Sequence, residues 1–435
     1  MSEFTQTFQE SYWRNRIQSV FAQLRELSGG GGGIGVTRPS YGLAETRGLD
    51  VIAELAAEGG LGVERDAAAN LVVTLAGRDP ALPAVATGSH MDSVPQGGNY
   101  DGAAGIVAGL VCLLRMKSEA EAPLHTIRLY GLRGEESAWF GKAYIGSLAL
   151  FGELTLHDME RTHRDSGLPL RHYMQELGAD VARVGRGDRL VDPASIAAYY
   201  ELHIEQGPAM VARRVPVGVV TGIRGNIRHF RILCRGTSGH SGAVPRWLRH
   251  DPVFALADLL VRLDEHWEKL QGQGVDLVIT SGVVQTNAAE HTLTRIPGEI
   301  AFSLDIRSQS LQTLDDFYQL LQDECAIVRR NRGVDFEFDE KMFTPPGEIA
   351  PELERRLVAI CEEMQVPFIE IPSGAGHDAA VFANRGVPSA MIFIRNEHGS
   401  HNPRESMDLD DFILGTEVLH AALRREAKCA SSRST

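Results

Sequence analysis

A histidine and two aspartates in the first third of the chain have a spacing that suits a metal site. His90 and Asp92 form a His-x-Asp motif, and Asp101 follows the glycine pair Gly97-Gly98. A histidine that binds a metal ion usually has its second ring nitrogen held by a carboxylate, and Asp92 can do this if the segment is extended. A lone His-x-Asp motif more often belongs to a polar turn, with the later aspartate capping a helix. The motif therefore needs partners before it indicates chemistry.

Further histidine and carboxylate side chains follow apolar runs elsewhere in the chain. A buried cluster of imidazoles and carboxylates is costly unless a cation occupies it, and a site without thiolates suits Zn²⁺ foremost, with Mn²⁺, Co²⁺ or Ni²⁺ as alternatives. Two ions need a bridging carboxylate and roughly two further protein ligands each. The expected ligands are His90 and His203 on one ion, Glu136 and His401 on the other, and Asp101 between them. Glu135 is then the general base that takes a proton from a metal-bound water.

Each of these residues also has an ordinary interpretation when it is taken alone. The Glu135-Glu136 pair is typical of a solvated acidic surface, and His203 of a hydrogen-bonded core histidine. The functional interpretation depends on their joint position after predicted strands. Histidines in polar or helical surroundings are expected at the surface, and they are His125, His157, His163, His172, His250 and His266.

Strands and helices alternate through most of the chain, and this order must position the ligands. We predict an α/β fold in which a mixed sheet is covered by helices. Because the carboxyl ends of parallel strands meet at one edge of such a sheet, side chains that follow them converge there. The predicted strands are 63–65, 71–75, 84–88, 126–131, 196–204, 367–370 and 389–394, and the predicted helices are 8–27, 43–58, 103–117, 142–150, 351–364, 379–383 and 409–424.

Residues 215–342 interrupt this alternation with a β-α-β-β-α-β order, which is the order of a two-layer, ferredoxin-like α+β unit. The expected domains are thus 1–214 with 343–435, and 215–342. The predicted elements of the insert are strand 227–234, helix 252–270, strands 277–284 and 299–306, helix 311–330 and strand 334–338.

The composition narrows the classes of partner. There are 57 acidic and 43 basic residues, a net charge of −14 without clustered Lys or Arg, which argues against a nucleic-acid partner. No apolar run has the roughly 18 residues that a membrane span needs. Five dispersed cysteines and a polar N-terminus without a signal-peptide core favour a cytoplasmic protein. The run Gly29–Gly33 is expected to be a loop, because it lacks the spacing of a phosphate-binding motif.

Taken together, the motifs resemble the M20 family of metallohydrolases, and most closely its amidohydrolase branch of N-carbamoyl-L-amino acid hydrolases, allantoate amidohydrolases and β-ureidopropionases. The matching stretches, in chain order, are GSHMDSVPQGGNYDGAAG, GEES, ELHIEQGP, GTSGHSGAVP, SLDIRS, SGAGHDA and GSHNPRES. The resemblance implies the dinuclear site described above, a lid and dimerisation role for the 215–342 insert, and a homodimer. It also implies that His240 stabilises an oxyanion in the partner subunit's site and that Arg307 binds the substrate carboxylate. The alternative for Arg307 is an internal salt bridge with Asp305.

The substrate pocket is less defined than the metal site. His203 distinguishes this branch from the peptidases of the family, which usually have a carboxylate there. The resemblance implies that Gln206 and His377 contact the polar head of the substrate. Thr294, three residues before Pro297, stands where carbamoyl-cleaving relatives commonly carry asparagine, and a hydroxyl cannot make the paired contacts of an amide. The identity of the substrate therefore stays open.

The expected reaction is hydrolysis of a linear C–N amide bond in a small carboxylate-bearing substrate, an N-carbamoyl-L-amino acid or a ureido acid. A metal-bound water, deprotonated by Glu135, attacks the carbonyl carbon, and Glu135 returns the proton to the leaving nitrogen. The alternatives are an allantoate amidohydrolase and a dipeptidase or N-acyl amino acid deacylase. A catalytically silent metal-binding protein would have lost a ligand or the base, and the sequence retains both.

Overall fold

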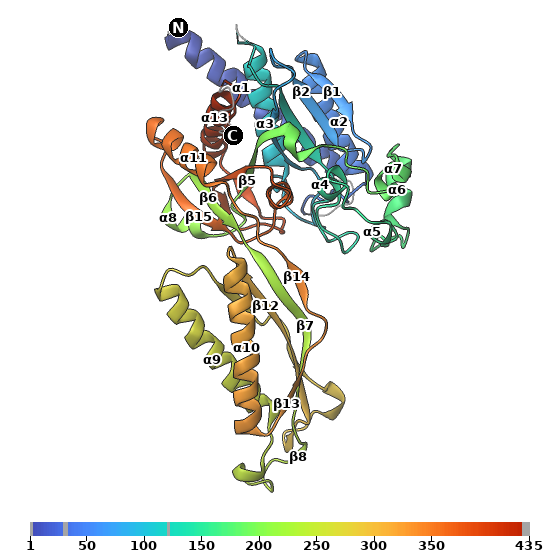
Figure 1. Ribbon diagram of the computed structural model, residues 1–435, viewed down its shortest axis with the longest axis vertical. Coiled ribbons are helices and arrows are strands. Elements are labelled where there is room, and N and C mark those ends of the chain that lie inside the picture. Colours follow the sequence, from blue (N-terminus) through green and yellow to red (C-terminus); the bar gives the residue numbers. More distant parts are fainter. Residues whose placement is uncertain (1–2, 29–33, 120–121, 429–435) are drawn as a thin grey trace. The chain divides into compact units, whose positions relative to one another are not determined.

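The computed structural model describes residues 3–28, 34–119 and 122–428, with side chains from residue 12 onward, and these residues form two compact units (Figure 1). The large unit consists of Met1–Thr221 and Glu348–Thr435, and the inserted unit consists of Gly222–Gly347. The predicted loop Gly29–Gly33 lies outside the described residues. Among the described helices, none is long and apolar enough to cross a membrane.

The large unit is built on a mixed sheet, which confirms the predicted fold class. Its central strands β4, β3, β5 and β16 run parallel to one another. The pairs β1–β2, β2–β4 and β16–β6 are antiparallel. β3 and β16 are buried along their whole length, as expected for strands covered on both faces. The strands in spatial order are β1 (Gly62–Arg65), β2 (Leu71–Leu75), β4 (Ile127–Leu132), β3 (Ala84–His90), β5 (Ile196–Ile204), β16 (Ser389–Ile394), β6 (Val217–Ile223) and β15 (Phe368–Ser373).

Helices of the large unit cover this sheet. α3 (Ala103–Lys117) packs on β3 and β5 and also contacts α13 (Leu409–Glu426). α3 begins directly after Asp101, so its packing on the sheet fixes where that carboxylate lies. The other elements of the large unit are α1 (Glu3–Ser28), α2 (Leu43–Glu58), α4 (Ile145–Leu150), α5 (Leu156–Met159), α6 (Leu170–Glu176), α7 (Val181–Gly185), η1 (Pro193–Ser195), α8 (Ala209–Arg213), α11 (Pro351–Glu363), α12 (Asp378–Ala383), β17 (Asn396–Glu397) and β18 (Ser406–Met407).

The inserted unit is a two-layer structure in which α9 and α10 lie on one face of an antiparallel sheet (Figure 1). Phe302, Phe317 and Leu259 are among the buried side chains that fill the space between helices and sheet. β8 and β11 form a separate ribbon. The elements are β7 (Gly225–Arg235), β8 (Gly239–His240), η2 (Arg246–Leu248), α9 (Pro252–Gly272), β9 (Val278–Thr280), β10 (Val284–Thr286), η3 (Ala288–Glu290), β11 (Arg295–Ile296), β12 (Glu299–Ser308), α10 (Leu311–Arg332), β13 (Asp335–Glu337) and β14 (Met342–Thr344).

Many predicted elements differ by a few residues from their bounds in the structure, and two of these differences have a clear structural reason. The strand predicted at 277–284 is divided into β9 and β10, because the register of β12 shifts at Ser303 and that residue bonds to Val283 through its hydroxyl and its backbone N–H. The helix predicted at 142–150 begins only at Ile145. Tyr144 has a left-handed φ of 62°, and the backbone N–H groups of residues 144–146 donate to carbonyls of residues 133–135 instead of starting a helix.

Two histidines predicted at the surface are buried, so that prediction was wrong for them. His163 lies between Trp139 and Tyr173, with ring centroids 5.4 and 5.2 Å away. The Nδ1 atom of His125 lies 2.7 Å from the carbonyl oxygen of Pro83. Both imidazoles find their partners through tertiary contacts that the surrounding polar sequence does not indicate.

Candidate metal centre

The five expected metal ligands all belong to the large unit. His90 is the last residue of β3, and His203 is the next-to-last residue of β5. Glu136 follows β4, and His401 lies in the loop between β17 and β18. Asp101 precedes α3 at a turn where Gly102 has φ 66° and where a Cβ would meet the ring of His90, so this turn requires glycine. The carboxyl ends of the parallel strands thus deliver most of the ligands to one edge of the sheet.

Among the described residues, two groups have ligand atoms close enough to hold an ion, and they share Asp101. In the first group, the Nε2 atoms of His90 and His203 lie 3.5 and 3.2 Å from Asp101 Oδ1, and 3.4 Å from each other. In the second group, His401 Nε2 lies 3.3 Å from Asp101 Oδ2 and 3.1 Å from Glu136 Oε1. This arrangement is that of a carboxylate bridging two ion sites.

The donor set fits divalent cations. Asp101 Oδ1 is buried and has no hydrogen-bond partner among the described residues, although two imidazole nitrogens face it. Burial alone would raise the pKa of the Asp101 carboxyl, but contacts with His203, His401 and His90 hold it well below its usual value. A carboxylate that stays ionised in a buried site, surrounded by imidazole nitrogens, is the environment that a cation such as Zn²⁺ requires. Such a cation is expected from the family as well as from these donors.

Asp92 is buried and organises the residues around the first group. Its Oδ1 atom lies 3.3 Å from His90 Nδ1 and accepts a hydrogen bond from the backbone N–H of Glu135 at 3.1 Å. Its Oδ2 atom accepts from the N–H of Glu136 at 3.1 Å and from the Ser40 hydroxyl at 2.6 Å. One carboxylate therefore orients the imidazole of His90 and fixes the turn that carries both glutamates. Ser40 is a contributor that the sequence analysis did not identify.

Glu135, the expected general base, lies beside the first ligand group. Its Oε2 atom lies 3.9 Å from His90 Nε2, and its side chain is largely buried. Burial raises the pKa of the Glu135 carboxyl well above its usual value, and Glu136 raises it further, while His90 opposes the shift. A carboxyl with a raised pKa accepts and returns a proton more readily near neutral pH than an ordinary glutamate does.

Gln206 and His377 also lie near the ligands. Gln206 has a left-handed φ of 63°, and its Nε2 donates to Asp101 Oδ2 at 3.0 Å. Its Oε1 atom is buried and has no partner in the described part of the chain. The ring of His377 lies 4.5 Å from that of His203, and its Nε2 lies 2.8 Å from the Ser373 hydroxyl. Burial, followed by the nearby His203, lowers the pKa of His377 well below its usual value, so this imidazole is neutral.

The other expected site residues lie in the inserted unit. His240 and Thr294 are exposed and adjacent, because β8 pairs with β11 and the N–H of Ser241 donates to the carbonyl of Thr294 at 2.8 Å. Arg307 donates from Nε and Nη2 to Asp305 Oδ2 at 3.0 and 2.7 Å, so the internal salt bridge considered as an alternative is present.

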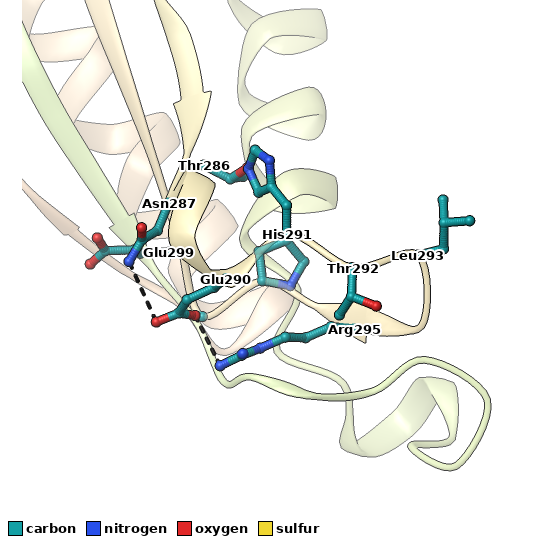
Figure 2. Close-up of a pocket in the computed structure, with 10 residues that line it drawn as sticks. Thr286, Asn287, Glu290, His291, Thr292, Leu293, Arg295 and Glu299 are labelled. Atoms are coloured by element: carbon teal, nitrogen blue, oxygen red, sulfur yellow. Dashed lines mark hydrogen bonds and ion pairs between the residues drawn. The ribbon is translucent and has the colours of Figure 1, made fainter.

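A cavity of about 420 Å³ lies in the inserted unit, along the segment that carries Thr294 (Figure 2). Its charged and polar groups are paired with one another: Arg295 with Glu290 at 2.9 Å, and His291 with Thr286 at 2.7 Å. The cavity is lined by Thr286, Asn287, Glu290, His291, Thr292, Leu293, Arg295, Pro297, Gly298 and Glu299. None of these lining residues belongs to the expected ligand set.

Comparison with known proteins assigns the chain to a family. The chain matches peptidase family M20/M25/M40 over residues 86–425. It is 32% identical to an N-carbamoyl-L-amino acid amidohydrolase of Geobacillus stearothermophilus over 388 residues, which cover 89% of this chain and 92% of that one. It is 30% identical to an allantoate amidohydrolase of Escherichia coli over 410 residues, covering 94% and 97%.

A solved structure of a hydantoinase/carbamoylase family amidase from Burkholderia multivorans superposes with a TM-score of 0.85. The two chains are 26% identical, and the match covers 96% of this chain and 98% of that one. A hydantoinase/carbamoylase family amidase from Burkholderia ambifaria gives a TM-score of 0.83 at 29% identity. Sequence and structure therefore agree: the chain belongs to the peptidase family M20/M25/M40, among its relatives that hydrolyse C–N bonds as amidohydrolases.

Proposed function

We propose that the protein hydrolyses the linear C–N amide bond of an N-carbamoyl-L-amino acid or a related ureido acid. The observation that carries this proposal is the sharing of Asp101 by two ligand groups, with Glu135 beside them. The amidohydrolase relatives support the choice of a carbamoyl or ureido group over a peptide. For an N-carbamoyl-L-amino acid, water is consumed and the products are the amino acid, carbon dioxide and ammonia.

The residues of the candidate site have different roles in the proposed hydrolysis. The five ligands would hold two divalent ions, which would polarise the substrate carbonyl and lower the pKa of a water molecule. Glu135 takes the proton from that water and passes it to the leaving nitrogen. Asp92 keeps Glu135 and His90 in place through its backbone and ring contacts. Gln206 offers its buried Oε1 atom to the N–H groups of a ureido substrate.

The inserted unit supplies the remaining contacts as a lid and dimerisation domain in a homodimer. Arg307 binds the substrate carboxylate, and His240 donates to the oxyanion in the partner subunit's site. Exposed apolar side chains of the inserted unit support self-association: Trp247, Phe254 and Val261 are 79%, 58% and 57% exposed. Sedimentation of a Trp247→Glu, Phe254→Glu double variant is expected to show a smaller species than the parent protein, and an unchanged distribution would contradict this interface.

Allantoate is the second candidate substrate. Thr294, which replaces the asparagine common in carbamoyl-cleaving relatives, favours a substrate head group with different hydrogen-bonding needs. A dipeptide or N-acyl amino acid is a further alternative, because the same ligands would polarise an ordinary amide.

A substrate panel separates these candidates. The protein loaded with Zn²⁺, Mn²⁺ or Co²⁺ is given N-carbamoyl-L-amino acids, allantoate, ureidoglycolate, dipeptides and N-acyl amino acids, and release of ammonia is measured beside release of free amine. We expect ammonia from carbamoyl or ureido substrates and little hydrolysis of dipeptides. Efficient dipeptide hydrolysis without ammonia release would overturn the proposal.

We also propose a reducing compartment, the cytoplasm, as the site of action. The described cysteines Cys112, Cys234, Cys325 and Cys361 are free and buried, which supports this assignment.

A further inference from the structure

Glu405 is a buried carboxylate that links two loops of the candidate metal centre. Its Oε1 atom accepts hydrogen bonds from the backbone N–H groups of Tyr100 and Asp101 at 2.9 and 3.3 Å. Its Oε2 atom accepts from the hydroxyl of Ser400 at 2.9 Å. This side chain therefore ties residues 97–102, the Asp101 loop, to residues 398–405, the His401 loop.

Ser400 lies between the two carboxylates. Its hydroxyl is hydrogen-bonded to Asp101 Oδ2 and to Glu405 Oε2. A hydroxyl has one proton, so it can donate to only one of these oxygens at a time. The Asp101 carboxylate is thus oriented by Ser400, which Glu405 holds, and by the side-chain NH₂ group of Gln206, which donates to the same Oδ2 atom at 3.0 Å.

Gly98 leaves the space that Glu405 occupies. A Cβ atom at this position would overlap the carboxylate carbon and both oxygens of Glu405. Glycine is therefore required at position 98 for steric reasons, because the backbone of the Asp101 loop lies directly against the Glu405 carboxylate. An alanine here would displace Glu405 without removing it.

His401 needs such support more than the other ligands do. Its side chain is 50% exposed, whereas those of His90 and His203 are 2% and 1% exposed. Its backbone has a left-handed φ of 59°, which costs free energy for a residue other than glycine and persists only where surrounding contacts fix it. Glu405 supports the loop through the Ser400 hydroxyl, while Asn396 and Asn402 donate to the backbone carbonyl oxygens of residues 398–400.

We propose that Glu405 is a positioning residue that holds Asp101 and His401 at the separation one divalent ion needs. The ion site formed by Asp101, Glu136 and His401 then depends on Glu405, while the site formed by His90, His203 and Asp101 depends on it much less, because β3, β5 and α3 fix those ligands. This inference rests on the metal centre of the proposed function.

The test is titration of Zn²⁺ into metal-free protein by calorimetry, with the visible absorption of bound Co²⁺ as a second readout. In Glu405→Leu the side chain keeps its approximate size but loses both oxygens, so the N–H groups of Tyr100 and Asp101 and the Ser400 hydroxyl lose this acceptor. We expect one ion to bind with wild-type affinity and the other about 10–100-fold more weakly, the usual effect of losing a contact behind a ligand. Gly98→Ala should reproduce this pattern.

Two further variants keep the test decisive. Ser400→Ala removes only a hydroxyl and serves if Glu405→Leu fails to fold; it should weaken the same ion about 10-fold. Glu324→Leu is the matched control, because Glu324 is a buried carboxylate of the inserted unit that pairs with Arg262 and His266. It should leave both affinities unchanged.

The outcomes separate this inference from the proposed function. A wild-type protein that binds no pair of ions would overturn the metal centre itself. A wild-type protein that binds two ions, together with Glu405→Leu and Ser400→Ala variants that bind both with unchanged affinity, would overturn the role of Glu405 alone. Equal weakening of both ions by Glu405→Leu would also contradict a role confined to the His401 side.

Discussion

Replacing Asp92 by asparagine is expected to damage metal binding far more than its small change in shape suggests. Both oxygens of Asp92 accept hydrogen bonds, and four donors face them: the Ser40 hydroxyl, the His90 ring and the N–H groups of Glu135 and Glu136. The NH₂ group of asparagine cannot accept, so at least one backbone N–H is left without a partner in either amide orientation.

The magnitude follows from these contacts. A buried N–H left unpaired costs about 1–3 kcal/mol, and this lowers the free energy of unfolding. The Nδ1 atom of His90 lies 3.1 Å from the backbone carbonyl oxygen of residue 92 as well as near the Asp92 carboxylate. If the amide NH₂ faces His90, only that carbonyl can still accept the Nδ1 proton, and the ring that must bind the ion through Nε2 is held less firmly. We therefore expect metal affinity to fall about 10–100-fold. Since the turn carrying Glu135 also shifts, kcat/KM should fall by roughly 10²–10³, equivalent to about 3–4 kcal/mol.

The assay combines Zn²⁺ affinity, measured by competition with a chromophoric chelator, with ammonia release from the best substrate of the panel. Asp66→Asn is the control, because Asp66 also accepts three hydrogen bonds, from Ala68 and from the backbone and side chain of Asn70, without contacting a ligand. It should lose stability but keep its metal affinity. An Asp92→Asn protein with wild-type affinity and turnover would refute the reasoning.

The other predictions concern the base, the carboxylate contact, the ions and the pH dependence of stability. Glu135→Gln should retain both ions while turnover falls about 10³-fold, and unchanged turnover would remove Glu135 from the mechanism. Arg307→Lys should raise KM about 10-fold or more with a smaller effect on kcat, because lysine cannot replace a planar guanidinium on a carboxylate; a purely kcat effect would argue against this contact. Treatment with a chelator should abolish activity and lower Tm, and Zn²⁺, Mn²⁺ or Co²⁺ should restore both. Burial lowers the pKa of His420 to about 4 from 6.5, so the unfolded chain takes up this proton at a higher pH than the folded chain does. The free energy of unfolding should consequently fall by about 2 kcal/mol more between pH 7.5 and pH 5 in the parent than in His420→Gln, as followed by urea unfolding, and parallel pH profiles would contradict it.

The sequence predicts that the candidate ligands lie close together, because their positions follow from local patterns. Apolar runs identify β3 and β5, and His90 and His203 lie at the ends of those runs, so the parallel sheet brings them together. Asp101 is predicted in the same way from the start of α3. The structure gathers these residues as expected; that they bind ions stays a prediction.

Features that depend on distant contacts could not be predicted from local patterns. The contact between Glu405 and Asp101 joins residues 304 positions apart, and its only trace in the sequence is that Glu405 lies in the GSHNPRES stretch. The start of α4 differs because the N–H groups of residues 144–146 are used by the turn before Glu135 rather than by a helix. In each case a tertiary hydrogen bond competes with the local propensity and replaces it.

The unequal exposure of the histidine ligands has a consequence for how the protein loses and regains its ions. An ion held by His90 and His203 is enclosed by the sheet, whereas one held by His401 borders solvent. The outer ion should therefore exchange faster, and dilution should first produce a half-loaded protein. Because Asp101 belongs to both ligand groups, loss of the outer ion frees an oxygen of the shared carboxylate and changes the affinity for the inner ion. The two occupancies are therefore thermodynamically linked.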